Sequence, residues 1–137
     1  MIDGFLKGRK ILIVEDDFSS RLYLNKILEK SGAVIYNASD GKEAYSLVMQ
    51  NPDIELILMD IQLPLMDGYK CTKMLRDSGM NMIVIAQTAY GLSGDKDRLI
   101  DSGFNDFLIK PISRSQLIEK LSSWLIKNND PIPDTAK

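Results

Sequence analysis

The sequence contains no histidine, and this absence removes a large part of protein chemistry. Without an imidazole the chain can hold no histidine-based catalytic triad, no histidine-ligated metal and no phosphohistidine. Any chemistry must therefore rest on carboxylates, hydroxyl groups, lysine or a thiol.

Cysteine is almost absent as well, because Cys71 is the only one in the chain. A single thiol excludes an internal disulfide, which favours a reducing compartment and a cytoplasmic protein. We interpret Cys71 as a small buried apolar side chain. No apolar run approaches the roughly 18 residues of a membrane span, and residues 1–9 lack the apolar core of a signal peptide, so no membrane insertion is expected.

A strong charge of one sign is also missing. The chain carries 17 basic and 19 acidic residues, a net charge of -2, so no direct nucleic-acid partner is expected. Its 137 residues, 45% of them apolar, suffice for one domain with its own core. We expect this domain at 9–127, preceded by a leader at 1–8 and followed by a flexible tail at 128–137.

What the sequence does contain is a regular alternation of short apolar runs and helical patterns. The apolar runs predict strands at 10–14, 33–36, 54–59, 82–86 and 107–109. Helical spacing separates them, with predicted capping boxes at Asp40 with Glu43 and at Ser113 with Gln116, and a weaker helix at 93–101. The last helix has a predicted core stripe formed by Leu117, Leu121, Trp124 and Leu125.

Strands that are apolar on both faces are typical of a parallel sheet covered by helices on both sides. The alternation therefore predicts an α/β fold with a five-stranded parallel sheet, order 2-1-3-4-5, flanked by five helices. In such sheets, ligands bind beyond the carboxyl ends of the strands, where the strand order reverses. With this order, that position lies between the first and third strands.

Polar side chains follow the apolar runs at these strand ends. Glu15 and Asp16 follow the first run, Asp60 the third, Thr88 the fourth and Lys110 the fifth. Three converging carboxylates repel one another unless a proton or a cation joins them. Since the expected ligands are oxygen atoms, the sequence predicts Mg²⁺, beside a lysine and a hydroxyl group suited to a phosphoryl group.

Each of these residues also has an ordinary structural interpretation. Glu15, Asp16 and Asp17 can cap the helix that follows, and we expect Asp17 mainly to do so. Asp60 can be a polar strand end, Thr88 a turn residue and Lys110 a solvated charge. The site interpretation rests on the whole set, because all these strand ends face one crevice.

Four motifs resemble the receiver domain of two-component response regulators. They are VEDD (14–17), LMDIQLPLMDG (58–68), AQTA (86–89) and FLIKP (107–111). The resemblance spans about residues 9–127, with the motifs in the family's order and spacing. It implies a flavodoxin-like receiver fold and a function in two-component or phosphorelay signalling.

The resemblance implies specific roles at the acidic strand ends. Asp60 would accept a phosphoryl group from a partner's phosphohistidine. Asp16 would bind Mg²⁺ directly, and Glu15 would assist through water. Asp60 and the backbone carbonyl of Gln62 would complete the protein ligands. The protein would be a signalling receiver that catalyses only its own phosphorylation and dephosphorylation.

Further roles are implied around this centre. Lys110 would pair with Asp60 and then with its phosphoryl group, while Thr88 would bond a phosphoryl oxygen and move with its loop. Phe107 stands where the family keeps a switching aromatic residue, and it can equally be a plain core aromatic. Gln62 and Tyr90 would border the phosphoryl group and set its lifetime, or be ordinary loop residues. The Lys110–Pro111 bond would be cis.

The implied partners are a histidine kinase or a histidine phosphotransfer protein. A downstream partner would bind the face formed by the fourth helix, fifth strand and fifth helix. Residues 60–68 and 86–111 look most like receivers of hybrid sensor kinases; the alternative is a stand-alone single-domain response regulator.

Three other functions fit the sequence less well. A Mg²⁺-dependent phosphatase with an aspartyl-phosphate intermediate is less favoured, because Gln62 stands where such enzymes carry a second aspartate. A receiver-like module that never gains phosphate conflicts with the complete set of site residues. A flavin module conflicts with the acidic loop after the first strand.

Overall fold

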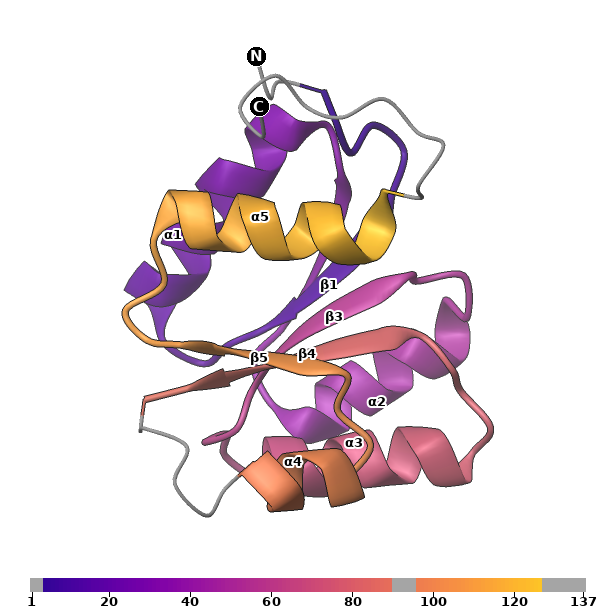
Figure 1. Cartoon of the computed structure of the whole chain (residues 1–137). Coiled ribbons are helices and arrows are strands. Elements are labelled where there is room, and N and C mark those ends of the chain that lie inside the picture. The colour runs from indigo at the N-terminus through magenta and orange to yellow at the C-terminus, as the bar shows by residue number, and fades with distance from the viewer. Residues whose placement is uncertain (1–3, 90–95, 127–137) are drawn as a thin grey trace.

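The computed structural model describes residues 4–89 and 96–126. Its strands are β1 (Lys10–Val14), β2 (Val34–Ala38), β3 (Leu56–Asp60), β4 (Ile83–Thr88) and β5 (Asp106–Ile109). Its helices are α1 (Phe18–Ser31), α2 (Gly41–Gln50), α3 (Gly68–Asp77), α4 (Lys96–Asp101) and α5 (Arg114–Leu125). All neighbouring strands are parallel, in the order β2-β1-β3-β4-β5, which confirms the predicted fold class (Figure 1).

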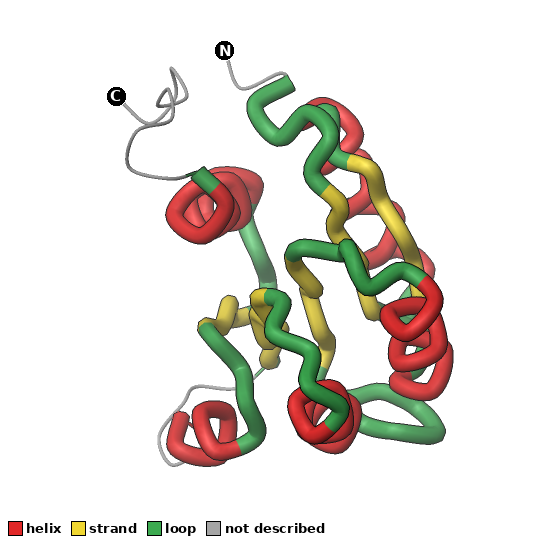
Figure 2. Tube along the Cα trace, turned by 90° about the vertical axis from the view of Figure 1, so that its right-hand side faces the viewer, coloured by secondary structure: helices red, strands yellow, loops and turns green. Residues whose placement is uncertain are grey.

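Helices cover both faces of the sheet, as the two views show (Figures 1 and 2). Ile13 and Leu58 belong to the core beneath α1 and α5, whereas Val14 and Met59 belong to the core beneath α2 and α3. Successive strand residues point to opposite faces, and here both faces are buried. This arrangement explains why the central strands are apolar runs rather than alternating patterns.

Side-chain caps begin α1, α2, α3 and α5. The predicted box at Ser113 is complete: its hydroxyl accepts from the Gln116 amide at 3.1 Å, and the Gln116 side chain accepts from the Ser113 amide at 3.2 Å. Asp40 accepts from the Glu43 amide at 2.8 Å, but the Glu43 carboxylate bonds the Ser39 amide instead of the cap residue. The second predicted box is therefore only half formed.

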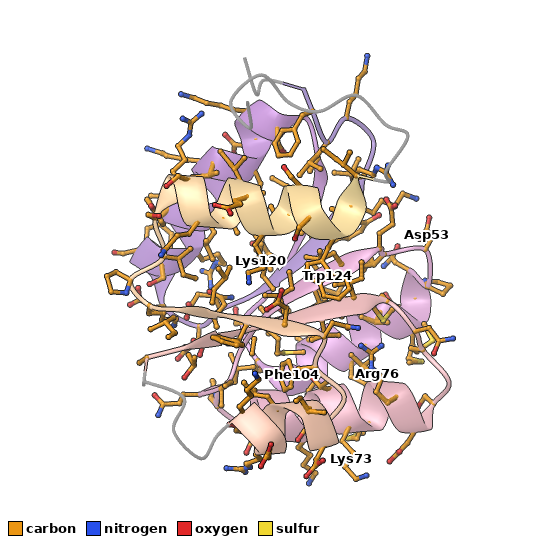
Figure 3. All side chains as sticks on the ribbon, in the orientation of Figure 1. Asp53, Lys73, Arg76, Phe104, Lys120 and Trp124 are labelled. Carbon is orange, nitrogen blue, oxygen red and sulfur yellow. The ribbon has the colours of Figure 1, made fainter. Side chains whose placement is uncertain are left out.

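Some predicted bounds and one predicted core residue are wrong. The third strand begins at Leu56 rather than at residue 54, and it includes Asp60 itself. The second strand is 34–38 rather than 33–36. Trp124 is 37% exposed, and its indole N–H donates to Asp106 at 2.8 Å (Figure 3). One step along α5 rotates it by about 100° from the buried Leu125 toward β5.

The first described segment packs against the domain. Leu6 is fully buried in the core beneath α1 and α5. The amides of Gly4 and Leu6 donate to the carbonyls of Lys30 and Ser31, at 2.9 and 2.8 Å. Within the two described ranges, we find no helix with both the length and the apolar character needed to cross a membrane.

Candidate functional site

The centre of the sheet determines where the polar strand ends meet. β1 and β3 are neighbours, with Val14 opposite Met59 in the parallel register. From β1 the chain continues to β2 on one side of the sheet and then to β3 on the other. Glu15 and Asp60 therefore flank the point where the strand order reverses, which is the usual ligand position in this type of sheet.

Three carboxylates meet at this point, as predicted. Glu15, Asp16 and Asp60 each offer a carboxylate oxygen, and these oxygens lie within 4.8 Å of one another. Glu15 and Asp60 are buried, whereas Asp16 is exposed. Such a cluster of hard oxygen ligands, open to solvent on one side, suits a hydrated Mg²⁺ ion.

Lys110 is the counter-ion of the two buried carboxylates. Its Nζ donates to Oδ2 of Asp60 at 2.9 Å and to Oε1 of Glu15 at 3.0 Å. Burial lowers the pKa of Lys110, but these two carboxylates outweigh burial and leave the pKa above its ordinary value. The lysine is therefore fully charged at neutral pH.

The two buried carboxylates perturb each other. Burial and the neighbouring Asp60 raise the pKa of Glu15 to about 7, against the lowering effect of Lys110 and of the Asp17 amide. That amide donates to Oε2 of Glu15 at 3.2 Å. The Glu15 carboxyl group is therefore partly protonated near neutral pH, and a divalent cation bound at the cluster would displace its proton.

The backbone around Asp60 is held tightly. Its Oδ1 accepts from the Gln62 amide at 3.1 Å, and its main chain pairs with Gln87 in β4. A methyl group at Gly68 would lie 2.4 Å from the Asp60 carbonyl oxygen, so only glycine fits there. Asp60 is thus a carboxylate on a rigid strand end, with Gln62 beside it.

The remaining predicted residues fall into three groups. Thr88 and Gln62 line the cleft together with the acidic cluster. Phe107 is half-buried on β5, away from this cleft, with Lys120 Nζ 5.8 Å from its ring centre. Tyr90 lies outside the described residues. The predicted cis bond is present between Lys110 and its proline.

Asp17 plays the structural role expected of it. Its side chain accepts from the Ser20 amide at 2.8 Å and so caps α1. This hydrogen bond lowers the pKa of Asp17. The cap leaves Glu15 and Asp16, rather than Asp17, to form the acidic cluster.

Three polar side chains that line the cleft were not predicted from the sequence. They are Gln87, Tyr69 and Arg98. Gln87 is buried, and within the described ranges its Nε2 has no hydrogen-bond partner. Gln87 could have been recognised from the sequence, because it is a polar side chain next to the apolar run of the fourth strand. Tyr69 and Arg98 reach the cleft from α3 and α4, and no sequence spacing indicated that approach.

The family model of the "Response regulator receiver domain" matches residues 11–122. A probable transcriptional regulatory protein, SilR of Salmonella typhimurium, is 34% identical over 126 residues, which are 92% of this chain and 55% of SilR. The chain spans between 7% and 55% of the length of the curated relatives compared.

Two solved structures are similar in fold and sequence. The receiver domain of sensor histidine kinase PA1611 from Pseudomonas aeruginosa, with magnesium coordinated in its active site cleft, has TM-score 0.78 and 34% identity, covering 85% of this chain and 97% of that one. The receiver domain of Ssk1, in complex with the histidine phosphotransfer protein Ypd1 of Saccharomyces cerevisiae, gives TM-score 0.82 and 29% identity, covering 90% and 96%.

The match to the family model covers most of the chain. The strand order, the acidic cluster and the lysine paired with Asp60 agree with this family. This chain therefore belongs to the response regulator receiver domain family, the signalling modules of two-component and phosphorelay systems.

Proposed function

We propose that Asp60 accepts a phosphoryl group from a phosphohistidine on a partner protein. The observation that carries this proposal is the contact between Lys110 and Asp60, 2.9 Å long, beside two further carboxylates. A carboxylate on a rigid strand end, paired with a fixed cation, is a suitable nucleophile for phosphoryl transfer. Lys110, together with a cation held by the carboxylates, would supply positive charge to offset the negative charge of the phosphoryl group.

In the proposed step, a carboxylate oxygen of Asp60 attacks phosphorus as the phosphorus–nitrogen bond of the donor breaks. The electron pair of that bond returns to the donor's imidazole, and an acyl phosphate forms on Asp60. Lys110 follows the charge from the carboxylate to a phosphoryl oxygen, and the Thr88 hydroxyl donates to another. Water later hydrolyses the acyl phosphate, which releases inorganic phosphate and restores the Asp60 carboxylate.

Magnesium is the cofactor that fits this site. Asp16 and Asp60 would hold it directly, Glu15 would assist through water, and the Gln62 carbonyl would complete the protein ligands. Bound there, the ion would neutralise charge on the transferred group. The donor set supports this assignment, because the cluster offers only oxygen atoms.

The proposed phosphodonor is a histidine kinase or a histidine phosphotransfer protein. Phe18 and Leu22, on the first turns of α1 next to the acidic loop, are 67% and 44% exposed. Exposed apolar side chains of this size are typical of interface anchors. We propose that the donor docks here, with its phosphohistidine over the cleft.

We propose a downstream partner on the face formed by α4, β5 and α5. Ile100, Ile109 and Trp124 are exposed there, one on each of these elements. We further propose that the domain extends over 9–127, with a leader at 1–8 whose Leu6 packs into the domain core and a tail at 128–137. The parent protein would be a hybrid sensor kinase or a stand-alone regulator. The single, buried Cys71 supports a cytoplasmic location.

Self-catalysed turnover belongs to the same proposal. The chain would speed its own phosphorylation and dephosphorylation, and Gln62 and Tyr90 would set the phosphate lifetime. Replacing Tyr90 by alanine should change the rate at which phospho-Asp60 decays. An identical decay rate in wild type and Tyr90→Ala would remove Tyr90 from this role.

The decisive experiment uses a small phosphodonor. The protein is incubated with Mg²⁺ and acetyl phosphate, and phosphorylation is followed by intact mass. We expect one acid-labile phosphoryl group on the wild type and none on Asp60→Asn. Asp77→Asn, which alters an exposed aspartate at the end of α3, is the control and should react like the wild type. Equal labelling of Asp60→Asn and wild type would refute the proposal.

A further inference from the structure

Arg98 of α4 is stacked on an aromatic ring at the edge of the acidic cleft. Its guanidinium carbon lies 3.8 Å from the centre of the Tyr69 ring, at the start of α3. Tyr69 is held in turn by Phe104, whose ring meets it edge-on with centres 6.0 Å apart. Phe104 lies on the α4 side of the sheet (Figure 3). The arginine is therefore placed by two aromatic side chains.

This stack leaves the hydrogen-bonding edge of the guanidinium available. A planar guanidinium can rest its face on a ring while its N–H donors point outward in the plane. Within residues 4–89 and 96–126, Arg98 forms no ion pair and no hydrogen bond through its side chain. Arg98 and Tyr69 line the same cleft as Asp60 and Thr88.

The charge in the cleft changes when Asp60 is phosphorylated. The three clustered carboxylates, Lys110 and a divalent cation sum to zero. Asp17 also lines the cleft, but its carboxylate caps α1 and lies outside the cluster. An acyl phosphate replaces the single charge of Asp60 by about two negative charges. One negative charge is then left over. Among the described residues that line the cleft, Arg98 and Lys110 are the cationic ones, and Lys110 is already counted.

We propose that Arg98 is a second phosphoryl-binding cation of this receiver, presented to the cleft by Tyr69. The inference rests on the proposed function, because it needs a phosphoryl group on Asp60. Arg98 donates from its edge to a phosphoryl oxygen and keeps its face on Tyr69. Because Arg98 belongs to α4, this contact links the position of α4 to the phosphorylation state.

The two residues have different parts in this arrangement. Arg98 binds the phosphoryl group, whereas Tyr69 is a positioning residue that holds the long arginine side chain at the rim. A charge-assisted hydrogen bond to a phosphoryl oxygen is stronger than a cation–π contact at an exposed site. When Asp60 is phosphorylated, Arg98 should therefore keep its hydrogen bond to the phosphoryl group even if its contact with the Tyr69 ring changes.

The test measures affinity for beryllofluoride, a non-covalent phosphoryl mimic, by calorimetry at saturating Mg²⁺. We expect Arg98→Gln to weaken beryllofluoride binding about five- to tenfold, because it removes a charged donor. Arg98→Lys should recover part of the lost affinity, since it restores the positive charge but not the planar guanidinium group that stacks on the ring. Tyr69→Leu should show an intermediate loss, because it removes the ring on which the Arg98 guanidinium is stacked.

Lys96→Gln is the matched control, because it removes one positive charge from the same helix without lining the cleft. It should change beryllofluoride affinity less than twofold. Mg²⁺ affinity measured without beryllofluoride should be no weaker in Arg98→Gln than in the wild type. This second readout separates loss of a phosphoryl contact from loss of the fold or of the metal site.

A direct readout is the NMR signal of the Arg98 Nε–H group. Beryllofluoride should shift it downfield, as expected for a new hydrogen bond, and leave the corresponding signal of Arg114 unchanged. Failure of wild type to bind beryllofluoride would refute the proposed function itself. Tight binding by wild type with an equal affinity in Arg98→Gln, or an unmoved Arg98 signal, would overturn only this inference.

Discussion

Nζ of Lys110 lies 2.9 Å from Oδ2 of Asp60, and the same nitrogen lies 3.0 Å from Oε1 of Glu15. One ammonium group thus neutralises two buried carboxylates from two neighbouring strand ends. A divalent cation at the same carboxylates would compete with it for their charge. Removing the Lys110 ammonium group should therefore change both the stability of the protein and its response to the divalent cation.

Replacing Lys110 by methionine should separate these effects. Without the ammonium group, Glu15 and Asp60 repel each other, so the metal-free variant should lose about 3 kcal/mol of unfolding free energy. Mg²⁺ should then raise the melting temperature of the variant more than that of the wild type. Phosphorylation by acetyl phosphate should slow about 100-fold, because a transition-state cation is gone.

Lys73→Met, on the exposed side of α3, is the control for Lys110→Met and should change none of these quantities. The measurements are thermal melts with and without Mg²⁺, and the rate of mass increase with acetyl phosphate. A smaller Mg²⁺ stabilisation in Lys110→Met than in the wild type would contradict the competition described above.

The raised pKa of Glu15 predicts a pH effect on metal binding. Burial and Asp60 raise that pKa to about 7, so protons compete with Mg²⁺ below this pH. Calorimetric Mg²⁺ affinity should fall by up to about tenfold per pH unit below pH 7 and level off above it. Glu15→Gln should bind more weakly at pH 8 and lose most of this pH dependence.

The same pKa fixes the sign of a stability effect. In the metal-free protein the folded pKa of Glu15 exceeds its ordinary value of 4.5. The folded state therefore holds an extra proton between pH 4.5 and 7, and the resulting stability is lost as the pH rises through 7. Urea unfolding should show this loss in wild type but not in Glu15→Gln; equal pH profiles would argue against it.

Asp106 predicts an acid transition that the only tryptophan can report. Burial raises the pKa of Asp106, but hydrogen bonds from Trp124, the Phe107 amide and Lys120 outweigh it and hold the pKa below 3.8. This stabilising contribution is present above pH 3.8 and is lost as the pH falls through the lowered pKa. Trp124 fluorescence should change there, below pH 3.8.

Asp106→Asn should remove that acid step and lower the unfolding free energy at pH 7 by about 1–2 kcal/mol. Glu119→Gln, which changes a neighbouring acid of α5, should keep the step. The prediction fails for this site if Asp106→Asn retains the fluorescence change of the wild type.

Arg76 joins the end of α3 to the segment between α4 and β5. Its guanidinium donates to the carbonyls of Gly103 and Met80 at 3.0 Å each, and to the side chain of Asn105 at 2.7 Å. Arg76→Ala should therefore cost about 2–3 kcal/mol of unfolding free energy. Chemical denaturation measures this loss.

Two variants check the contribution of Arg76. Lys73→Ala, whose side chain lies away from Arg76 on the same helix (Figure 3), should cost less than about 0.5 kcal/mol. Arg76→Lys should recover less than half of the loss, because one ammonium cannot reach three separate acceptors. A fully stable Arg76→Lys would show that the positive charge alone, rather than the three hydrogen bonds of the guanidinium group, holds this segment.

The order of the elements was predictable from the sequence because fully buried strands leave uninterrupted apolar runs. The polar ends of those runs also predicted the meeting of Glu15, Asp16 and Asp60. Strand bounds were less accurate, since Asp60 pairs in the ladder with Gln87 although its side chain is charged. Backbone pairing depends on the neighbouring strand rather than on the residue's own polarity.

Contacts between elements could not be predicted in the same way. The stack of Arg98 on Tyr69 requires α3 and α4 to approach at a particular angle, which no local spacing encodes. Trp124 was assigned to the core because its position on α5 is next to the buried face. Its bond to Asp106 shows that the edge of β5 offered its indole N–H a partner there.

The burial of Leu6 has a practical consequence for fusions. Its segment is tied to the last turn of α1, and α5 ends at the same edge of the sheet, since both helices run back from the carboxyl ends of the strands. A tag or a neighbouring module attached at either end of the described domain would join it opposite the cleft. The cleft would then stay accessible to a docking protein, whereas a chain shortened past Leu6 would lose about 2–5 kcal/mol of packing.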